Sequence, residues 1–297
     1  MVYHKDCSWV SVYAPYATQV EWLLYENDHA PLPFQRITLE KGKDGFFQSK
    51  CKGDLEDKYY AFSFFQHGEW SPPLLDLYTK STGCNGKRAQ IYASSTTDVI
   101  GWESDHFENP LPISDAIIYE LHVRDFSISP NSGIRHKGKY KGLVEQPSLT
   151  SDGLASGLDH LKELGITHVQ LMPVFDFDSV DESYESEENY NWGYDPYHWM
   201  VPEGSYSDHP SQAKDRIIGF KQMILAFHQA GIGVIMDLVL NHFSENRFQE
   251  LVYLYPNELF RTWPDGSFSN GSGCGNEVAS EKKSSPTTHD SNGSLLG

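Results

Sequence analysis

The stretch GLASGLDHLKELGITHVQLMPV, residues 153–174, decides the fold class. Leucines recur at helical spacing up to residue 164, a glycine follows, and the apolar run ITHVQLMPV begins at the next residue. Because glycine commonly ends a helix, this pattern predicts a helix over 153–165 that passes directly into a buried strand. The face of this helix that is expected to be buried carries Leu154, Leu158, Leu161 and Leu164.

The same alternation continues on both sides of this stretch. The apolar run AIIYELHV (116–123) precedes it, and GVIMDLVL (233–240) follows a second amphipathic segment that ends at Gly231. The apolar positions of that segment are Ile217, Phe220, Ile224 and Phe227. Nearly continuous apolar strands joined by helices are typical of a parallel sheet covered by helices. The sequence therefore predicts a β-α-β-α-β order and an α/β fold for this part of the chain.

The N-terminal third has a different pattern of apolar and polar residues. Short apolar or alternating runs such as WVSVY (9–13), VEWLLY (20–25) and YYAFSFF (59–65) are separated by turn residues, which predicts a small all-β sandwich. Glycines and prolines interrupt residues 82–112, as expected of a connection. We therefore predict a β-sandwich domain over 1–110 and a second domain that begins at 111.

Loop lengths indicate where a site would lie in the second domain. Each predicted helix reaches the next strand almost directly, whereas the strands lead to their helices through long segments, about 124–151 and 175–212. Loops of this length inside a compact domain are usually functional. In parallel α/β architectures, ligands bind at the carboxyl ends of the strands, so the site is predicted at that edge.

Three groups of residues in this region could carry chemistry. The aromatic segment NWGYDPYHW (191–199) either pins its loop to the fold or forms a stacking platform for sugars or bases, and the pattern leaves both open. Polar residues at the end of DLVLNH (237–242) favour a functional site. The acidic run 176–188 lacks the D-x-D-x-D-G calcium pattern, so a solvated, mobile loop is favoured and calcium is left as an alternative.

Composition excludes some partners. Twenty-three basic and 41 acidic residues give a net charge of −18, which disfavours nucleic acid and anionic membranes and suits a neutral ligand. No apolar run is as long as a membrane span, and the first residues lack a signal-peptide pattern, so a cytoplasmic location is expected. The four cysteines lack metal-site spacing and are expected to be free thiols. No cofactor is expected to be required.

Four motifs resemble those of a known family, in the same order. They are YELHVRDFS (119–127), YNWGYDPYHWMVPEGSYS (190–207), DLVLNH (237–242) and FRTWPDGSFSNGSGCGNEVASE (260–281). With these motifs the chain resembles the α-amylase superfamily of glycoside hydrolases and is most similar to type I pullulanases. Those enzymes cleave α-1,6 linkages in pullulan, starch, glycogen and limit dextrins. Isoamylase-like debranching enzymes share the WGYDP motif and are the alternative within the superfamily.

The resemblance implies a domain plan and roles for particular residues. It implies an Ig-like sandwich of the starch-binding type, followed over 111–281 by the first three β/α units of an incomplete (β/α)8 TIM barrel. In the family, Tyr194 would stack under the sugar at the cleavage site and His242 would donate a hydrogen bond to that sugar. The other residues implied are Trp192, Asp195 and Asn241 as substrate-binding residues and Asp237 as a structural support of the cleft.

The family pattern also has elements that the chain lacks. Retaining glycoside hydrolases use two carboxyl groups about 5 to 5.5 Å apart. In the family both come from later strands, of which the fourth carries a G-F-R-F-D type motif that does not occur here. Asp195 and Glu203 are unconvincing replacements because no rigid spacing pairs them. We therefore expect an inactive, C-terminally truncated chain with a disordered, non-family tail over 282–297.

Two further expectations follow from this absence. A non-catalytic α-glucan-binding protein that uses the N-terminal module is the alternative function, and the sequence leaves open whether a second polypeptide supplies the other barrel strands. Three parallel strands would leave an open edge and exposed apolar faces, so this part of the chain is expected to aggregate.

Overall fold

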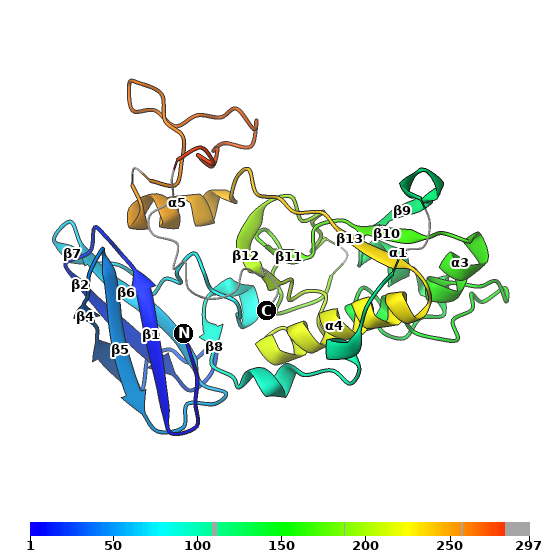
Figure 1. Cartoon of the computed structure of the whole chain (residues 1–297), viewed down its shortest axis with the longest axis horizontal. Helices are drawn as coiled ribbons and strands as arrows, with labels where there is room; N and C mark the ends of the chain where they lie inside the picture. Colours follow the sequence, from blue (N-terminus) through cyan, green and yellow to red (C-terminus); the bar gives the residue numbers. More distant parts are fainter. Residues whose placement is uncertain (109–111, 187, 257, 283–297) are drawn as a thin grey trace.

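The computed structural model describes residues 1–108, 112–186, 188–256 and 258–282. Figure 1 shows antiparallel strands of the N-terminal part at one end of the molecule and a helix-and-sheet part at the other. The predicted domain boundary at 110/111 falls on residues outside the described ranges. The predicted tail also lies outside them, apart from Lys282.

The N-terminal lobe contains two antiparallel sheets. One has the strand order β1-β5-β4; the other has the order β3-β2-β6-β7, with β8 paired to β6. The strands are β1 (Cys7–Tyr13), β2 (Gln19–Tyr25), β3 (Gln35–Thr38), β4 (Glu40–Lys41), β5 (Phe46–Lys52), β6 (Tyr59–Gln66), β7 (Glu69–Trp70) and β8 (Ala89–Gln90). Alternate side chains of a strand point to opposite faces, and Val10 and Val12 of the first sheet share one core with Trp22 and Leu24 of the second. The Ig-like topology stays a prediction.

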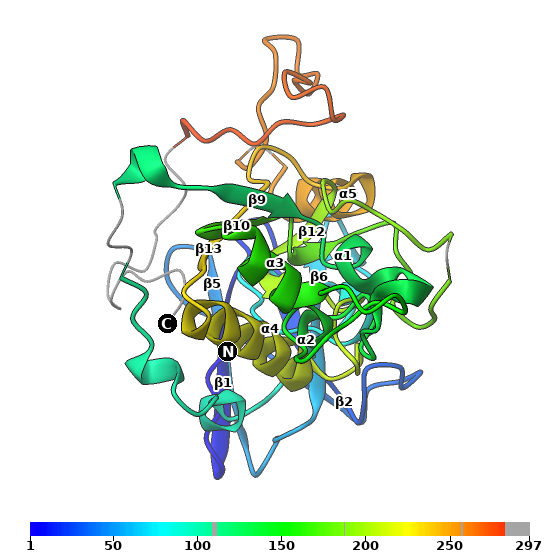
Figure 2. The same cartoon turned by 90° about the vertical axis from the view of Figure 1, so that its right-hand side faces the viewer.

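The second lobe is built on a three-stranded parallel sheet with the order β13-β10-β9. Its strands are β9 (Ile118–Leu121), β10 (His168–Leu171) and β13 (Gly233–Met236). Helices α3 (Gly157–Leu164) and α4 (Ala213–Gln229) lie against the same face of this sheet, as Figure 2 shows. The predicted β-α-β-α-β order is confirmed.

Helix α3 is shorter than predicted. Leu158 and Leu161 are fully buried, but Leu154 is 67% exposed and Leu164 is 50% exposed. The reason is that residues before 157 form a turn closed by a bridge between Leu149 and Ala155, which keeps Leu154 outside the helix. Gly165 ends the helix with a φ of 72°, as the sequence predicts.

Both long connections contain secondary structure. The first contains the short helices α1 (Asp125–Ile128), η5 (Pro130–Ser132) and α2 (Tyr140–Leu143). The second contains an antiparallel pair, β11 (Phe175–Phe177) with β12 (Pro196–Pro202), so its description as a loop was wrong in that respect. The remaining short helices are η1 (Cys84–Gly86), η2 (Ser94–Thr97), η3 (Trp102–Ser104) and η4 (Ile113–Asp115).

The two lobes share a core, which the sequence did not indicate. Helix α5 (Glu245–Leu254) places Phe248, Leu251 and Leu254 in the same apolar cluster as the N-terminal strands. The buried guanidinium of Arg247 donates hydrogen bonds to the carbonyl oxygens of Leu75 and Asp76. No described helix combines the length and the apolarity that a membrane crossing requires.

Candidate active-site face

The carboxyl ends of β9, β10 and β13 meet at one edge of the sheet, because Leu121, Leu171 and Met236 lie in register. The segment that follows β13 carries Asp237, Asn241 and His242. The loop between β11 and β12 carries the first half of the aromatic motif, up to Asp195. The structure brings these two segments into contact.

The contact centres on Tyr194. Its hydroxyl donates to Oδ2 of Asp237 across 2.9 Å, and its side chain is 39% exposed. Trp192, on the same loop, is 60% exposed. Partial burial and the Asp237 carboxylate raise the pKa of Tyr194 to about 12, and Glu120 of β9 adds to the effect. At neutral pH the phenol is therefore protonated, and the hydrogen bond to Asp237 fixes its ring.

His242 holds the loop to the strand end. The ring is buried, its Nε2–H donates to the carbonyl oxygen of Tyr194 across 2.8 Å, and its Nδ1 lies 3.0 Å from Oδ1 of Asn241. Burial lowers the pKa of His242, so the ring is neutral at pH 7. Since Nε2 already contacts Tyr194, this ring orients the tyrosine, and its predicted contact with a sugar stays a prediction.

Asp195 shapes the turn that presents the two exposed rings. Nδ2 of Asn191 donates to its Oδ1 across 2.6 Å, and Oδ1 of Asn191 accepts from the backbone N–H of Gly193. Gly193 has a φ of 91°, and a Cβ there would lie 2.9 Å from Pro173, so only glycine fits. Burial raises the pKa of Asp195 to about 6. Its predicted contact with substrate also stays a prediction.

The rest of the aromatic motif faces the other way. Tyr197 is buried and accepts a hydrogen bond from Nζ of Lys87, and Nε2–H of His198 donates to the carbonyl oxygen of Gly86. The ring of Trp199 stacks on Phe243, with centroids 4.2 Å apart. The motif therefore divides: three side chains pack into the fold, and the two rings of Trp192 and Tyr194 are exposed, so a stacking role stays a prediction for these two.

Comparisons with known proteins show the family and the fold. The model of the α-amylase catalytic domain matches residues 126–263. A pullulanase of Bacillus subtilis is 39% identical over 284 residues, which are 95% of this chain and 38% of that protein. The crystal structure of a pullulanase from Paenibacillus barengoltzii, complexed with maltohexaose and α-cyclodextrin, is 39% identical with a TM-score of 0.90, over 95% of this chain and 44% of that one.

The chain belongs to the α-amylase family of glycoside hydrolases. Isoamylase 1 of Arabidopsis thaliana is also similar, with 32% identity over 76% of this chain and 31% of that protein. The chain therefore spans less than half the length of each of these relatives. The parallel β9-β10-β13 sheet fits part of the TIM barrel of this family.

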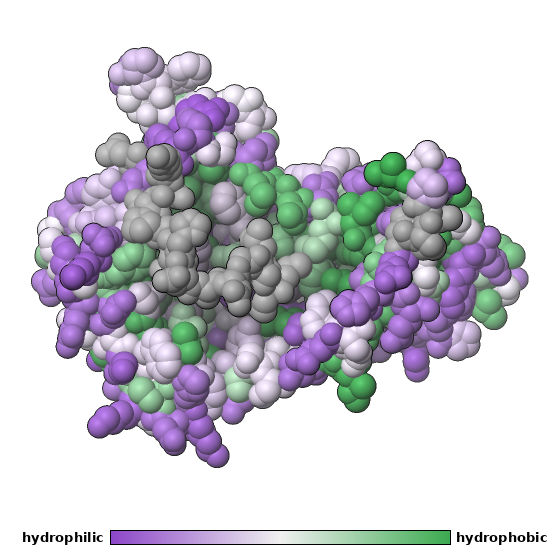
Figure 3. Space-filling model, in the orientation of Figure 1, coloured by the Kyte–Doolittle hydropathy of each residue, from purple (hydrophilic) through white to green (hydrophobic). Residues whose placement is uncertain are grey.

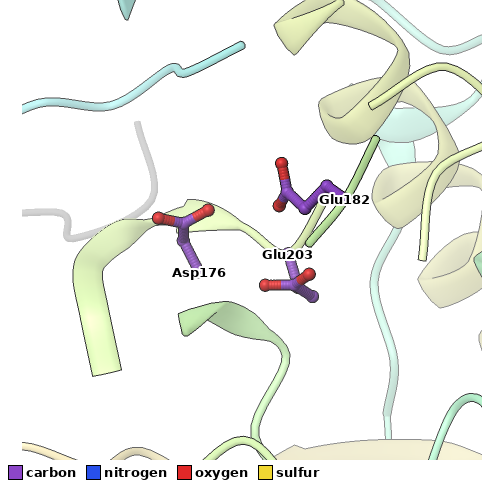
Figure 4. A group of neighbouring side chains, drawn as sticks. All are labelled: Asp176, Glu182 and Glu203. Atoms are coloured by element: carbon purple, nitrogen blue, oxygen red, sulfur yellow. The ribbon is translucent and has the colours of Figure 1, made fainter. Parts of the chain in front are cut away.

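The structure corrects the prediction for the acidic run, residues 176–188. Asp176 and Glu182 were expected in a solvated, mobile loop, but both are buried together with Glu203. Figure 4 shows the three carboxylates gathered in one place. We call these residues and Arg216 the buried charge cluster. Nη1 of Arg216 donates to Asp176 across 3.1 Å, and its Nη2 donates to Glu182 across 2.6 Å.

The cluster has more negative than positive groups. Burial, together with the charge of Glu182, raises the pKa of Asp176 and of Glu203 well above the usual range, and Arg216 opposes the shift. A calcium ion needs six to eight oxygen ligands, whereas the guanidinium of Arg216 already occupies oxygens of Asp176 and Glu182. The described residues of this cluster therefore do not fit calcium.

The cluster joins the connection between the lobes to the aromatic loop. Nη2 of Arg216 donates to the carbonyl oxygen of Gly83, and Glu182 exchanges two backbone-to-side-chain hydrogen bonds with Asn85. At Gly204 a Cβ would lie 2.3 Å from both Arg216 and Glu182. The loop that carries Tyr194 is thus fixed at its base by ion pairs and close packing.

Sequence reasoning missed Arg216, although a signal existed. Residues Ala213, Arg216, Phe220, Met223 and Phe227 recur at helical spacing, and all are buried. A charged residue within an apolar stripe needs a buried partner, and the acidic run was the available source of one.

Proposed function

We propose that this chain provides the sugar-binding side of an α-glucan debranching site, at which α-1,6 linkages of pullulan, starch or glycogen are the substrate bonds. The similarity to pullulanases and isoamylases supports this class of substrate. The observation that carries the proposal is the pair of exposed rings, Trp192 and Tyr194, at the carboxyl edge of the sheet, with Tyr194 anchored on Asp237.

Aromatic rings suit this role because their apolar faces stack on the C–H faces of sugars, while a hydroxyl edge satisfies polar neighbours. Tyr194 is held at two points, through its hydroxyl by Asp237 and through its carbonyl by His242. A ring that is fixed before the ligand arrives loses little conformational freedom on binding. Asn241 and Asp195 would then act by holding the strand end and the turn.

Hydrolysis is not expected of these 297 residues alone. The mechanism requires a carboxyl pair about 5 to 5.5 Å apart that faces the sugar. Glu203, one of the two replacements considered, is buried and accepts hydrogen bonds from the backbone N–H groups of Phe177 and Ser205. Asp195 is turned toward Asn191. We therefore propose that this chain binds α-glucan without cleaving it.

Affinity electrophoresis in gels that contain pullulan tests the proposal. The chain should be retarded, and Trp192→Ala and Tyr194→Ala should each weaken retardation about tenfold, because each removes a stacking face. Trp263→Ala is the matched control, since Trp263 is 59% exposed on the segment beyond α5. Equal retardation of all four proteins would contradict the proposed site. A reducing-end assay on pullulan should show no turnover above heat-treated protein.

The N-terminal sheets offer a second candidate surface. We propose residues 1–110 as the glucan-binding-type module, because Trp9 of β1 and Trp70 of β7 are partly exposed there. If this module binds the glucan, Trp9→Ala or Trp70→Ala will abolish retardation and Trp192→Ala will not. Comparing pullulan gels with glycogen gels separates a pullulanase-like from an isoamylase-like preference.

A further inference from the structure

A cavity lies apart from the two exposed rings, between the connection after β9 and the loop after β11. Its volume is about 290 Å³, and neither Trp192 nor Tyr194 lines it. Its lining includes His122, Arg124, Lys137, Lys139, Tyr206 and Glu185.

The contacts of His122 leave the hydroxyl group of the neighbouring Tyr206 as a hydrogen-bond donor without an acceptor. Nδ1 of His122 accepts from the backbone N–H of Asp125 across 3.2 Å, so the proton of the neutral ring is on Nε2. Nε2 lies 3.0 Å from the carbonyl oxygen of Asn191 and 2.8 Å from the hydroxyl oxygen of Tyr206. Both of these oxygens therefore accept from Nε2–H. Within the described residues, the hydroxyl proton of the buried Tyr206 has no acceptor and is free for a group in the cavity.

Arg124 has donors to spare at the same cavity. Within the described part of the chain, its one hydrogen bond is a 3.5 Å contact from Nη2 to the carbonyl oxygen of Ser186. Its ion pair with Asp125 is 3.6 Å long, beyond hydrogen-bond distance. The side chain is only 21% exposed. The guanidinium also lies over the ring of Tyr190, 5.3 Å from its centroid, a contact that occupies no hydrogen-bond acceptor. An arginine side chain that is largely buried and has so few acceptor oxygens is well suited to a ligand that offers them.

Two lysines add positive charge around the cavity. Nζ of Lys139 donates to the carbonyl oxygen of Ser205 and pairs with Glu185, which leaves one of its three N–H groups. Nζ of Lys137 is satisfied by three oxygens of the neighbouring turn and contributes charge only. Of the acidic residues that line the cavity, Glu182 is bound to Arg216. A cationic cavity in a chain of net charge −18 is unexpected from composition.

We propose that this cavity binds a small phosphate monoester, with the phosphoryl oxygens accepting from Arg124, Lys139 and the hydroxyl of Tyr206. Three donors, two from the connection after β9 and one from the segment after β12, suit a tetrahedral group with several acceptor oxygens. Arginine is the residue best matched to phosphate. The partly exposed ring of Tyr184, which also lines the cavity, offers a face for a sugar attached to the phosphate. The phosphate could belong to a free sugar phosphate or to an ester on a glucan.

Isothermal titration of the full chain tests the proposal with glucose 6-phosphate, inorganic phosphate and maltose. Glucose 6-phosphate and inorganic phosphate should bind, more weakly at high salt, and maltose should not displace them. Arg124→Met should weaken binding at least about tenfold, and Tyr206→Phe about threefold to tenfold, since each removes a hydrogen bond to a charged group. Arg135→Met is the control because Arg135 is exposed and outside the cavity.

The alternatives give different results. No heat with either phosphate, displacement by maltose, or equal weakening by Arg124→Met and Arg135→Met would overturn the proposal. If Arg124→Met does not fold, Tyr206→Phe still decides, because it removes one oxygen only. Stronger retardation in a phosphorylated glucan gel than in an unphosphorylated one, abolished by glucose 6-phosphate, would identify the glucan ester as the ligand. Equal retardation in both gels would identify the free sugar phosphate. None of these results depends on the rings at 192 and 194.

Discussion

At the scale of the residue, the motif NWGYDPYHW shows how one aromatic stretch serves two purposes. Trp192 and Tyr194 come before β12, on a turn that Gly193 bends outward. Tyr197, His198 and Trp199 lie within β12 and pack toward the connection and α5. The two groups have similar residue types, so the backbone conformation decides which side chains are exposed and which are buried.

Asp195 gives a prediction at this scale. Its folded pKa of about 6 lies above the ordinary value of 3.8, so the carboxyl group favours folding below pH 3.8, and that contribution is lost as the pH rises through 6. The neutral side chain of Asp195→Asn should therefore make the chain more stable at pH 8, by about 2 kcal/mol after allowance for solvent screening. The gain should disappear at pH 4. Urea unfolding at both pH values measures it.

The exposed Asp152 provides the control. Asp152→Asn should leave the free energy of unfolding unchanged at both pH values. If Asp195→Asn gave the same stability change at pH 4 and pH 8, the burial of this carboxyl group would not be the cause.

At the scale of the element, helix α4 does more than cover the sheet. Six of its buried positions are apolar or small, and the seventh carries Arg216 into the buried charge cluster. The helix thereby connects the base of the aromatic loop to the turn at Gly83. Since a buried ion pair depends on both partners, the element tolerates little change at this position.

Arg216→Met is predicted to be severely destabilising. It leaves Asp176, Glu182 and Glu203 without their buried cation, and removing one partner of a buried pair typically costs about 3 to 5 kcal/mol. The loss of unfolding free energy should be smaller at lower pH, because protonation of the three carboxylates removes their uncompensated negative charge. The measurement is urea unfolding at pH 7 and pH 5. Arg135→Met, an exposed control, should change stability by less than about 1 kcal/mol; an equal loss in both variants would rule out the cluster as the cause.

At the scale of the whole molecule, the lobes share one core, and the parallel sheet of the described residues has three strands. Phe243, Phe248 and Phe260 join the core of the N-terminal strands, so we expect the lobes to unfold together. Within the described residues, β13 has a strand neighbour on one side only. Leu238 and Leu240, just beyond β13, are about half exposed, and Figure 3 shows hydrophobic surface over this part of the sheet.

This edge predicts self-association. An unpaired strand edge with exposed leucines invites pairing with another chain. The chain should show a mass above that of the monomer in light scattering coupled to size exclusion, rising with concentration. The double variant Leu238→Glu/Leu240→Glu should have a measured mass closer to that of the monomer. Ile100→Glu changes an almost fully exposed isoleucine away from the sheet and should have no such effect; a monomeric parent chain would contradict the prediction.

The sequence predicted the helices and strands that have a clear hydrophobic periodicity. It did not predict contacts with partners from distant segments of the chain. The parallel order and the stop at Gly165 were predicted correctly, because periodicity and strand direction are local properties. The acidic run was misjudged because its partner, Arg216, lies beyond β12, on another element. The shorter α3 was missed because helical spacing does not reveal a turn before the helix.

By itself, the sequence determined the division into an all-β part and an α/β part, the edge of the sheet at which a site would lie, and the family resemblance. All three depend only on the order and spacing of residues. Tertiary structure alone decided which aromatic rings face solvent, that three carboxylates and Arg216 are buried together, and that α5 joins the lobes in one core. It also placed Arg124, Lys139 and Tyr206 around one cavity. The physical reason is that burial and charge pairing depend on segments far apart in the chain, whose meeting no local pattern encodes.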